Sequence, residues 1–189
     1  MELLDIVDEN NILTGEAKDR KTMHEQGLWH RHVSCWIMNE NGELLFQKRA
    51  ACKDRNANRW SKTGGHVESG ETVEQAIIRE VEEEIGIHLD EEKLQLIDVF
   101  KSKEKNNKYF AYDYFAIVEY KIEEYILQVE EVSEVKYYSI EEIEKLKNDN
   151  DENYTFSKWC NDDFNNKMRF LKEKRAKLKN ALNLKLDIK

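Results

Sequence analysis

The chain has 189 residues, of which 40% are hydrophobic and 37% charged, and its net charge is −9 at pH 7. This length and composition suit one folded domain and exclude a disordered tail. Apolar runs such as residues 35–38 are far shorter than the roughly 18 residues needed to cross a bilayer, and acidic residues near the start argue against a secretory leader. Because binding to nucleic acid depends on Lys and Arg, the negative charge disfavours it. We therefore expect a cytoplasmic protein with no membrane partner, and the charge disfavours a nucleic-acid partner.

The first third of the chain predicts two β-hairpins. Apolar residues at 4–7 and 11–13 flank Asp8-Glu9-Asn10, which are typical turn residues. Residues 32–38 and 43–49 flank Asn41-Gly42, the pair most typical of a two-residue hairpin turn. A polar stretch at 16–26 separates the hairpins, and 50–58 is expected to be a charged loop.

A helix is predicted next, because the apolar period changes from two to about 3.6. Thr72 and Gln75 have the spacing of a capping box, and Gly86 suits the left-handed exit of a helix, so we expect the helix to span Val73–Ile85. Strands are expected at 94–102 and 109–120, joined by a polar turn at 103–107, and at 134–138. A short helix should run from Ser139 to Lys147, followed by a polar break at 148–153 and one or two further helices.

Residues 1–150 are predicted to form the main domain, with 1–28 as an N-terminal hairpin and lead-in. Residues 151–189 are a helical extension. Eight Lys or Arg residues against two acidic ones lie in 168–189. Met168, Leu171, Leu178 and Leu182 recur there at helical spacing, which favours packing on the same domain or a homodimer contact over a nucleic-acid edge.

Three glutamates on the predicted 73–85 helix indicate a metal site. Glu80, Glu83 and Glu84 stand at i, i+3 and i+4 and so share an arc of roughly 100°. Crowded carboxylates repel one another, so at least one should have a raised pKa, and oxygen ligands of this kind suit Mg²⁺ or Mn²⁺. A solvated acidic face is the alternative for an isolated Glu-x-x-Glu-Glu string.

The context of these glutamates resembles a known family. From Gly65 to Ile87 the chain matches the Nudix box, G-x5-E-x7-R-E-u-x-E-E-x-G-u with u aliphatic, at all nine specified positions. The matched positions are Gly65, Glu71, Arg79, Glu80, Val81, Glu83, Glu84, Gly86 and Ile87. The chain is thus similar to Nudix hydrolases, which implies an α+β fold, the Nudix α/β/α sandwich with a mixed sheet. It also implies hydrolysis of a nucleoside diphosphate linked to X, or a related pyrophosphate, with Mg²⁺ or Mn²⁺.

The resemblance also implies roles for individual residues. Glu80, Glu83 and Glu84 would hold the metal, with a carbonyl at Gly64, while Arg79 would orient carboxylates and Gly65, Glu71 and Gly86 would shape the box. Glu83 is one candidate general base, and Glu130 and Glu131 are others, with an exposed acidic turn as the structural alternative for that pair. Lys48, Arg49 and Arg59 are expected to contact substrate phosphates, although solvated strand ends are common for such residues.

The stretches 5–8, 27–31, 44–49 and 60–67 resemble the Nudix subgroup around type I isopentenyl diphosphate isomerase, and this resemblance covers about residues 4–146. That isomerase requires a Cys where this chain has Gly64, and its later glutamates correspond to about Ala111 and Asp113. Hydrolysis is therefore favoured over isomerisation, and a non-catalytic nucleotide or RNA binder is a further alternative. His24, His30 and His66 fall near positions where the isomerase gathers a second metal, but without those glutamates we expect hydrogen-bonded structural histidines.

Overall fold

A computed structural model describes residues 2–104 and 106–186. The chain divides into two compact units, Met1–Trp36 with Thr63–Ala116, and Ile37–Lys62 with Ile117–Lys189. Strand β3 (Trp29–Asn39) runs from the first unit into the second. Residues 151–186, predicted as an extension, belong to the second unit together with earlier parts of the chain.

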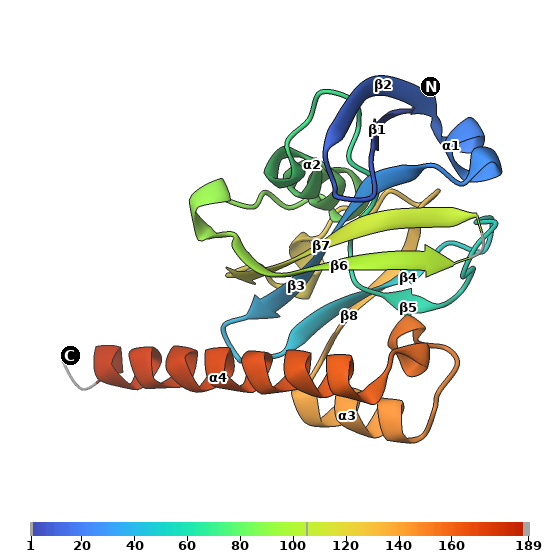
Figure 1. Ribbon diagram of the computed structural model, residues 1–189. Coiled ribbons are helices and arrows are strands. Elements are labelled where there is room, and N and C mark those ends of the chain that lie inside the picture. The colour runs from blue at the N-terminus through green and yellow to red at the C-terminus, as the bar shows by residue number, and fades with distance from the viewer. Residues whose placement is uncertain (1, 105, 187–189) are drawn as a thin grey trace. The chain divides into compact units, whose positions relative to one another are not determined.

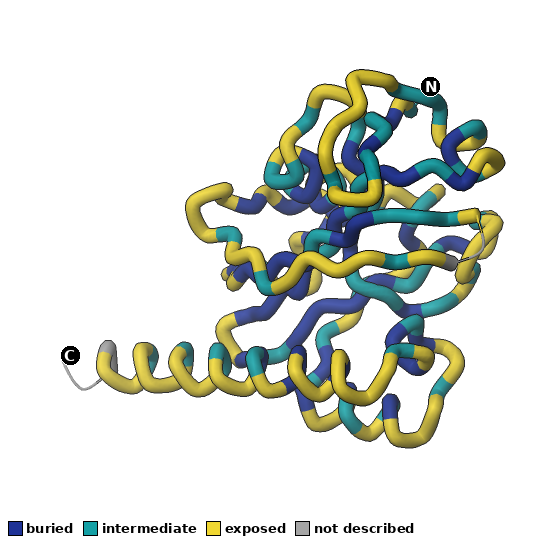
Figure 2. The backbone as a smooth tube through the Cα atoms, viewed as in Figure 1, coloured by how far each residue is buried: buried dark blue, intermediate teal, exposed yellow. Residues whose placement is uncertain are grey.

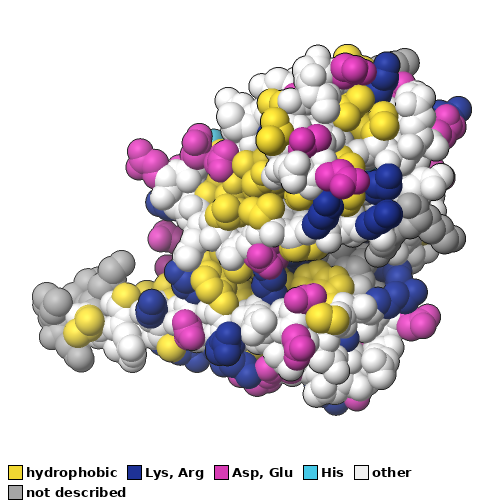
Figure 3. Space-filling model, in the orientation of Figure 1, with side chains coloured by type: hydrophobic (Ala, Val, Ile, Leu, Met, Phe, Trp, Pro, Cys, Tyr) yellow, Lys and Arg dark blue, Asp and Glu magenta, His cyan; other side chains and the backbone are white. Residues whose placement is uncertain are grey.

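The first unit contains strands β1 (Leu3–Val7) and β2 (Leu13–Asp19), which pair antiparallel, and β1 also pairs with β3. Strand β6 (Gln95–Glu104) pairs antiparallel with β7 (Asn107–Val118), which begins in this unit and pairs with β3 (Figure 1). Its helices are α1 (Arg20–Gln26), α2 (Val73–Ile85) and the 3-10 turn η1 (Glu91–Lys93). Figure 3 shows hydrophobic side chains gathered over β6 and β7, where Leu96, Val99 and Phe100 are exposed.

The second unit is built around β4 (Leu44–Arg49), which pairs antiparallel with the end of β3, with β5 (Trp60–Ser61) and with β8 (Val132–Tyr138). A parallel bridge joins Trp60 to Tyr154. The helical segments are η2 (Ile122–Glu124), α3 (Ile140–Asn148), η3 (Thr155–Lys158) and α4 (Asn161–Leu186). No helix among the described residues is long and apolar enough to cross a membrane.

Helix α4 packs through its first half. Phe164, Met168 and Leu171 are buried, and Lys172 and Arg175 form ion pairs with Glu144 and Glu141 of α3. Figure 2 shows most of the later turns exposed. The basic segment is therefore held to its own unit by both apolar burial and opposite charge.

Several predicted elements are confirmed and others need correction. The 73–85 helix, both hairpins and the 50–58 loop are confirmed, and α3 ends one residue beyond its predicted limit. The stretch 16–26, expected as one polar connection, instead completes β2 and forms α1. The turn predicted at 103–107 is too long. Strands β6 and β7 continue to pair within it, because Lys103 pairs with Lys108. Residue 105 of this turn lies outside the described residues. Strand β8 begins two residues earlier than predicted.

Candidate active site

Helix α2 positions the three glutamates, and its limits follow from local sequence. The Thr72 side chain accepts from the Gln75 amide, the Gln75 side chain accepts from the Thr72 amide, and Gly86 ends the helix with φ 73°. The buried residues Ala76, Ile77, Val81 and Ile85 fix the helix rotation. This rotation puts Glu84 inside with 4% exposure, while the side chain of Glu80 keeps 14% exposure and that of Glu83 keeps 54%. The glutamate arc therefore spans the boundary between interior and surface.

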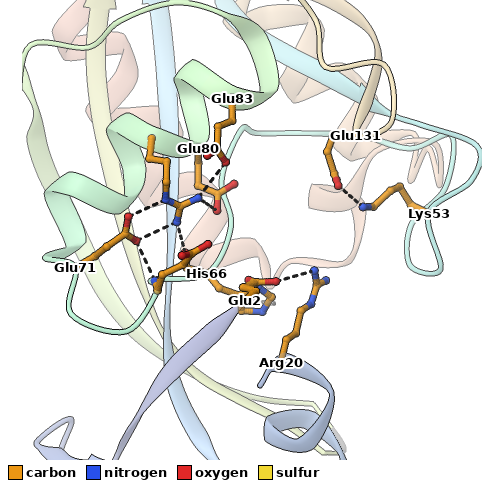
Figure 4. A network of polar contacts seen from close by, with 10 residues as sticks. Glu2, Arg20, Lys53, His66, Glu71, Glu80, Glu83 and Glu131 are labelled. Atoms are coloured by element: carbon orange, nitrogen blue, oxygen red, sulfur yellow. Dashed lines mark hydrogen bonds and ion pairs between the residues drawn. The ribbon is translucent and has the colours of Figure 1, made fainter. Parts of the chain in front are cut away.

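Arg79 ties these carboxylates to the preceding loop. Figure 4 shows how Glu71, Glu80, Glu83 and His66 lie around these contacts. Its Nε and Nη2 donate to the two carboxylate oxygens of Glu71 at 2.7 and 3.0 Å. Its Nη1 donates to Glu80 at 3.0 Å and to Glu83 at 3.2 Å, and Nη2 also donates to the His66 carbonyl at 3.0 Å. A planar guanidinium with five donors suits this bidentate and branching arrangement, which a lysine could not reproduce.

Two glycines allow the loop to approach α2 and β3. A Cβ atom on Gly65 would lie 2.3 Å from Oε1 of Glu80, and one on Gly64 would lie 2.2 Å from the Val33 carbonyl oxygen. Val33 and Gly65 exchange two backbone hydrogen bonds, of 2.9 and 3.1 Å, which fix the loop against the strand. Any side chain at either glycine would force the loop or its neighbour to move.

Two carboxylates of this network, Glu71 and Glu80, have pKa values shifted in opposite directions. Burial, together with the charge of Glu84, raises the pKa of Glu80 to about 8, against the attraction of Arg79. The raised pKa expected from crowding is thus present at Glu80, although burial is its largest cause. Despite its partial burial, Glu71 has a lowered pKa because Arg79 donates to it, and the same bond raises the pKa of Arg79. Glu71 and Arg79 therefore form a fixed ion pair beside a carboxylate that is poised to gain or lose a proton.

The other predicted site residues lie in the second unit. Lys48 is 4.0 Å from Glu134 and lies over the Trp60 ring, while Arg49 donates from Nε to the Arg55 carbonyl. Arg59 donates from Nε to the Glu152 carbonyl at 2.5 Å. Both arginines thus brace loop backbone in this structure.

Glu131, a candidate general base, pairs with Lys53 at 2.5 Å, and its carbonyl accepts from the Ala50 amide. Glu130 is exposed, and its carbonyl accepts from Cys52. Both candidates therefore contribute backbone contacts that hold the 50–58 loop.

A cluster of histidines lies in the first unit. The ring centroids of His24, His30 and His66 are 5.2–5.4 Å apart, and one possible ligand atom from each lies within 4.8 Å of the others. In the ranges 2–104 and 106–186, this is the one group of three or more His, Cys, Asp or Glu residues that meets this criterion, so Glu80, Glu83 and Glu84 do not converge in the same way. Coordination by Glu83 would compete with its ion pair to Arg79.

Sequence reasoning missed Glu2, and it named Asp113 only as a counterpart of an isomerase glutamate, without its burial or its partners. Glu2 lies 3.0 Å from Nδ1 of His66, and Asp113 is fully buried, accepting from Ser34 and from the Trp36 indole. Neither contact has a local spacing signal, because each joins residues more than 60 positions apart. A charged residue in a long apolar strand is the weak signal that could have indicated the buried role of Asp113.

Comparison with known proteins decides the family. Residues 28–160 match the NUDIX domain family. The chain belongs to the Nudix family. A Nudix hydrolase of Clostridium acetobutylicum, itself uncharacterised, is 36% identical over 77% of this chain and 73% of its own length. Isopentenyl-diphosphate Delta-isomerase 2 of Photorhabdus laumondii is 30% identical over 82% of this chain and 86% of its own length.

Solved structures agree on the fold. A protein from Deinococcus radiodurans superposes with a TM-score of 0.62 at 24% identity, covering 75% of this chain and 86% of that one. The α+β class and the Nudix sandwich predicted from the sequence are confirmed. Nudix membership and the Nudix hydrolase relatives support a pyrophosphohydrolase, and dependence on divalent metal is typical of the family.

The residues of this Nudix site fit a divalent ion on chemical grounds. Glu80 and Glu84 offer carboxylate oxygens, the ligands preferred by hard cations, and Gly65 leaves Glu80 the space that a Cβ atom would fill. The side chain of Glu83 adds a third, more exposed carboxylate.

Proposed function

We propose that the chain hydrolyses a phosphoanhydride bond of a nucleoside diphosphate linked to X, or a related pyrophosphate, with Mg²⁺ or Mn²⁺. The observation that supports this most is the Arg79 network, which holds Glu80 and Glu83 on α2 beside the Gly64–Gly65 loop. Such a network is expected where carboxylates must keep a fixed geometry around a cation.

Glu80, Glu83 and Glu84, with the Gly64 carbonyl, are the proposed metal ligands. When bound, the ion supplies charge neutralisation at the phosphate oxygens and lowers the pKa of an attacking water. Arg79 and Glu71 act as positioning residues, since the Glu71 pair fixes the guanidinium that holds Glu80. Gly86 ends α2 and so sets how far the acidic face extends.

Lys48, Arg49 and Arg59 remain proposed substrate-contacting residues. Lys48 has the weakest competing partner, at 4.0 Å from Glu134, so it is the best placed of the three to exchange its partner for a phosphate. Arg59 already donates to a backbone carbonyl, so its contribution would come from its remaining guanidinium nitrogens.

The group that accepts the proton from water has two proposed sources. Glu83 accepts a hydrogen bond from Arg79 and lies on the helix that carries the proposed ligands. Glu131 is paired with Lys53, and Glu130 precedes it. Whichever of these glutamates is the general base would determine the acid limb of the pH–rate profile.

Isomerisation is the rival activity, because an isopentenyl-diphosphate isomerase is among the relatives. The position that requires Cys in the isomerase is Gly64, and a Cβ there would lie 2.2 Å from the Val33 carbonyl oxygen. A thiol could not be placed at this position without moving β3. This geometry supports hydrolysis over isomerisation. A cytoplasmic location and a small-molecule partner complete the proposal.

The deciding experiment is a turnover panel with Mg²⁺ or Mn²⁺ over nucleoside di- and triphosphates, nucleotide sugars, dinucleoside polyphosphates and prenyl diphosphates. We expect phosphate or nucleotide release from a nucleotide substrate. Glu80→Gln should lower kcat by orders of magnitude, while Glu82→Gln, an exposed change on the same helix, should not. Proton exchange into isopentenyl diphosphate without phosphate release would establish the isomerase instead, and tight nucleotide binding without turnover would establish a binding protein.

A further inference from the structure

Strand β6 is the outer strand of its sheet. It pairs antiparallel with β7, and among the described strands it has no second partner. After an irregularity between Leu96 and Asp98, seven consecutive residues, 98–104, pair with β7 without a further shift. Along such an edge, alternate backbone N–H and C=O groups point away from the neighbouring strand, so a long regular edge is a template for pairing with another strand.

The side chains of β6 are exposed as well as its edge. Figure 2 shows the strand exposed along most of its length. Leu96 is 46% exposed, and Val99 and Phe100 are each 41% exposed, so three large apolar side chains meet solvent within five residues. An apolar surface beside an open strand edge is typical of a protein interface.

The two ends of β6 carry opposite charge. Residues 90–92, directly before the strand, are all acidic, whereas residues 101–108 contain four lysines and one glutamate. Glu91, Glu92, Lys101 and Lys103 are all exposed. Two copies of β6 that pair antiparallel bring the acidic start of each strand toward the basic end of the other, twice by symmetry. A parallel arrangement would bring like charges together, so the strand is complementary to an antiparallel second copy of itself.

Charged side chains within β6 also restrict the register of such a pair. A twofold axis perpendicular to the sheet places one residue of the strand opposite the same residue of the second copy. An axis at Asp98 or at Lys101 would set two like charges directly opposite each other, which is destabilising. An axis at Val99 or at Phe100 avoids this and sets an apolar side chain at the centre of the interface.

We propose that two copies of the chain associate by antiparallel pairing of β6 with β6, with Val99 or Phe100 at the twofold axis. The sheet of the first unit then continues across the axis, which pairs the open backbone groups and removes apolar side chains from water. Attraction between exposed charges is modest, so the charged ends set the direction of pairing while apolar burial supplies most of the affinity. The surface shares no residue with the acidic face of α2.

Sedimentation equilibrium of the full chain measures the association. We expect a concentration-dependent dimer of the wild type, and we expect Val99→Lys to raise the dimer Kd by about 10-fold or more, since it exchanges apolar burial for like charges near the axis. Leu3→Lys is the matched control, because Leu3 is 48% exposed on β1, which pairs with β2 and β3. It should dimerise as the wild type does, and circular dichroism shows that each variant is folded.

A wild type that stays monomeric would overturn the proposal and leave the edge of β6 to a different chain. Equal dimerisation of folded Val99→Lys and the wild type would overturn it as well, because the interface would then lie elsewhere.

Single cysteines locate the axis. In a background with both exposed cysteines replaced (Cys52→Ser, Cys160→Ser), Val99→Cys or Phe100→Cys should form an intermolecular disulfide under mild oxidation. Directly opposed residues of antiparallel strands have Cα atoms about 4.5–5.5 Å apart, which a disulfide can span. Leu3→Cys, equally exposed, should not cross-link. Equal cross-linking at all three positions would indicate random collision and contradict the proposal.

Charge reversal tests the direction of pairing. Lys103→Glu brings acids together at both ends of an antiparallel dimer, and Glu92→Lys brings lysines together, so each variant alone should raise the dimer Kd by about 3- to 10-fold. An equimolar mixture of the two variants should recover the affinity of the wild type, because both ends of the mixed dimer then attract. Single variants that dimerise as tightly as the wild type would overturn the antiparallel arrangement. None of these measurements uses substrate, so they are independent of the proposed hydrolase activity.

Discussion

Gly65 lies so close to Glu80 that a Cβ atom would come within 2.3 Å of its Oε1 and within 2.5 Å of its Oε2. Glu80 cannot simply swing away, because Arg79 holds it and little of it reaches solvent. We therefore expect Gly65→Ala to displace the carboxylate and lower kcat by about 10- to 100-fold, the range typical when support for a metal ligand is disturbed. Steady-state kinetics at saturating Mg²⁺ would measure this effect.

The control is Gly15→Ala. Gly15 has a positive φ, 83°, which Gly65 does not have, but a Cβ there meets nothing within 4 Å. This variant should carry backbone strain without a steric clash and keep its kcat. An equal kcat loss in both variants would mean that a glycine change away from Glu80 is enough, and would remove the steric argument.

Arg79→Lys should separate charge from geometry. Lysine keeps the positive charge but loses the fork that bonds Glu71 twice while also reaching Glu80, Glu83 and the His66 carbonyl. We expect kcat to fall by about 100-fold with KM changing far less, because the variant misplaces ligands rather than removing a substrate contact. A rise in KM at unchanged kcat would instead make Arg79 a substrate-binding residue.

The parts of this site that sequence alone predicts are the ones set by local spacing. The capping pair Thr72 and Gln75 and the exit glycine Gly86 fix α2 to the residue. Glu71 and Arg79 are eight positions apart, with Thr72 and the first residues of α2 between them, and the Nudix pattern specifies both. Local rules of this kind need no knowledge of the rest of the chain.

Tertiary packing decides the features that sequence could not predict. The apolar stripe of Ile77, Val81 and Ile85 places Glu84 on its own face and Glu83 beside it, but how completely each side chain is buried depends on the packing partners of the helix. Helix α1 has seven residues and one buried apolar side chain, Met23, so it carries almost no periodic signal. The contact of Glu2 with His66 depends on how β1 is placed, which no pattern near Glu2 encodes.

The pH–rate profile should identify the general base. We expect Glu83→Gln to flatten the acid limb of kcat, because a glutamine cannot take the proton, and Glu131→Gln to leave that limb in place, because its pair with Lys53 holds the 50–58 loop. Lys53→Gln serves as the control for loss of the ion pair alone. Loss of the acid limb in Glu131→Gln, with the limb retained in Lys53→Gln, would transfer the role to Glu131.

The ion pair between Glu141 and Arg175 predicts an acid-sensitive contribution to stability. The hydrogen bond from Arg175 lowers the pKa of Glu141 to about 2, against an ordinary 4.5. A carboxyl with a depressed folded-state pKa stabilises the fold above its unfolded pKa, and this contribution is lost as pH falls from about 4.5 to about 2.

The side chain of Glu141 is 59% exposed, so the gain should stay below about 1 kcal/mol. The free energies of unfolding of wild type and Arg175→Gln, measured in urea, should therefore differ slightly at pH 7, and the electrostatic part of that difference should disappear near pH 2. The methylene groups of Arg175 also lie against Gly42, so the packing part of the difference should persist at all pH values. A difference that grows on acidification would contradict this assignment.

The dependence of Tm on Mg²⁺ tests whether the glutamates of α2 bind the ion. Glu80 is largely buried beside Glu84, so the metal-free protein bears the cost of crowding carboxylates, and an ion that binds only the folded state relieves it. A concentration of Mg²⁺ about 100-fold above Kd should add about 2.7 kcal/mol to the free energy of unfolding and raise Tm accordingly. The variant with Glu80, Glu83 and Glu84 all changed to Gln should lose this shift, while its metal-free form should melt at or above the wild type because the repulsion is gone.

His24→Gln should keep the Mg²⁺ shift, since imidazoles are poor ligands for that ion. Equal Mg²⁺ shifts in the wild type and the triple variant would mean that the ion binds elsewhere, and the acidic face of α2 would lose its assigned role.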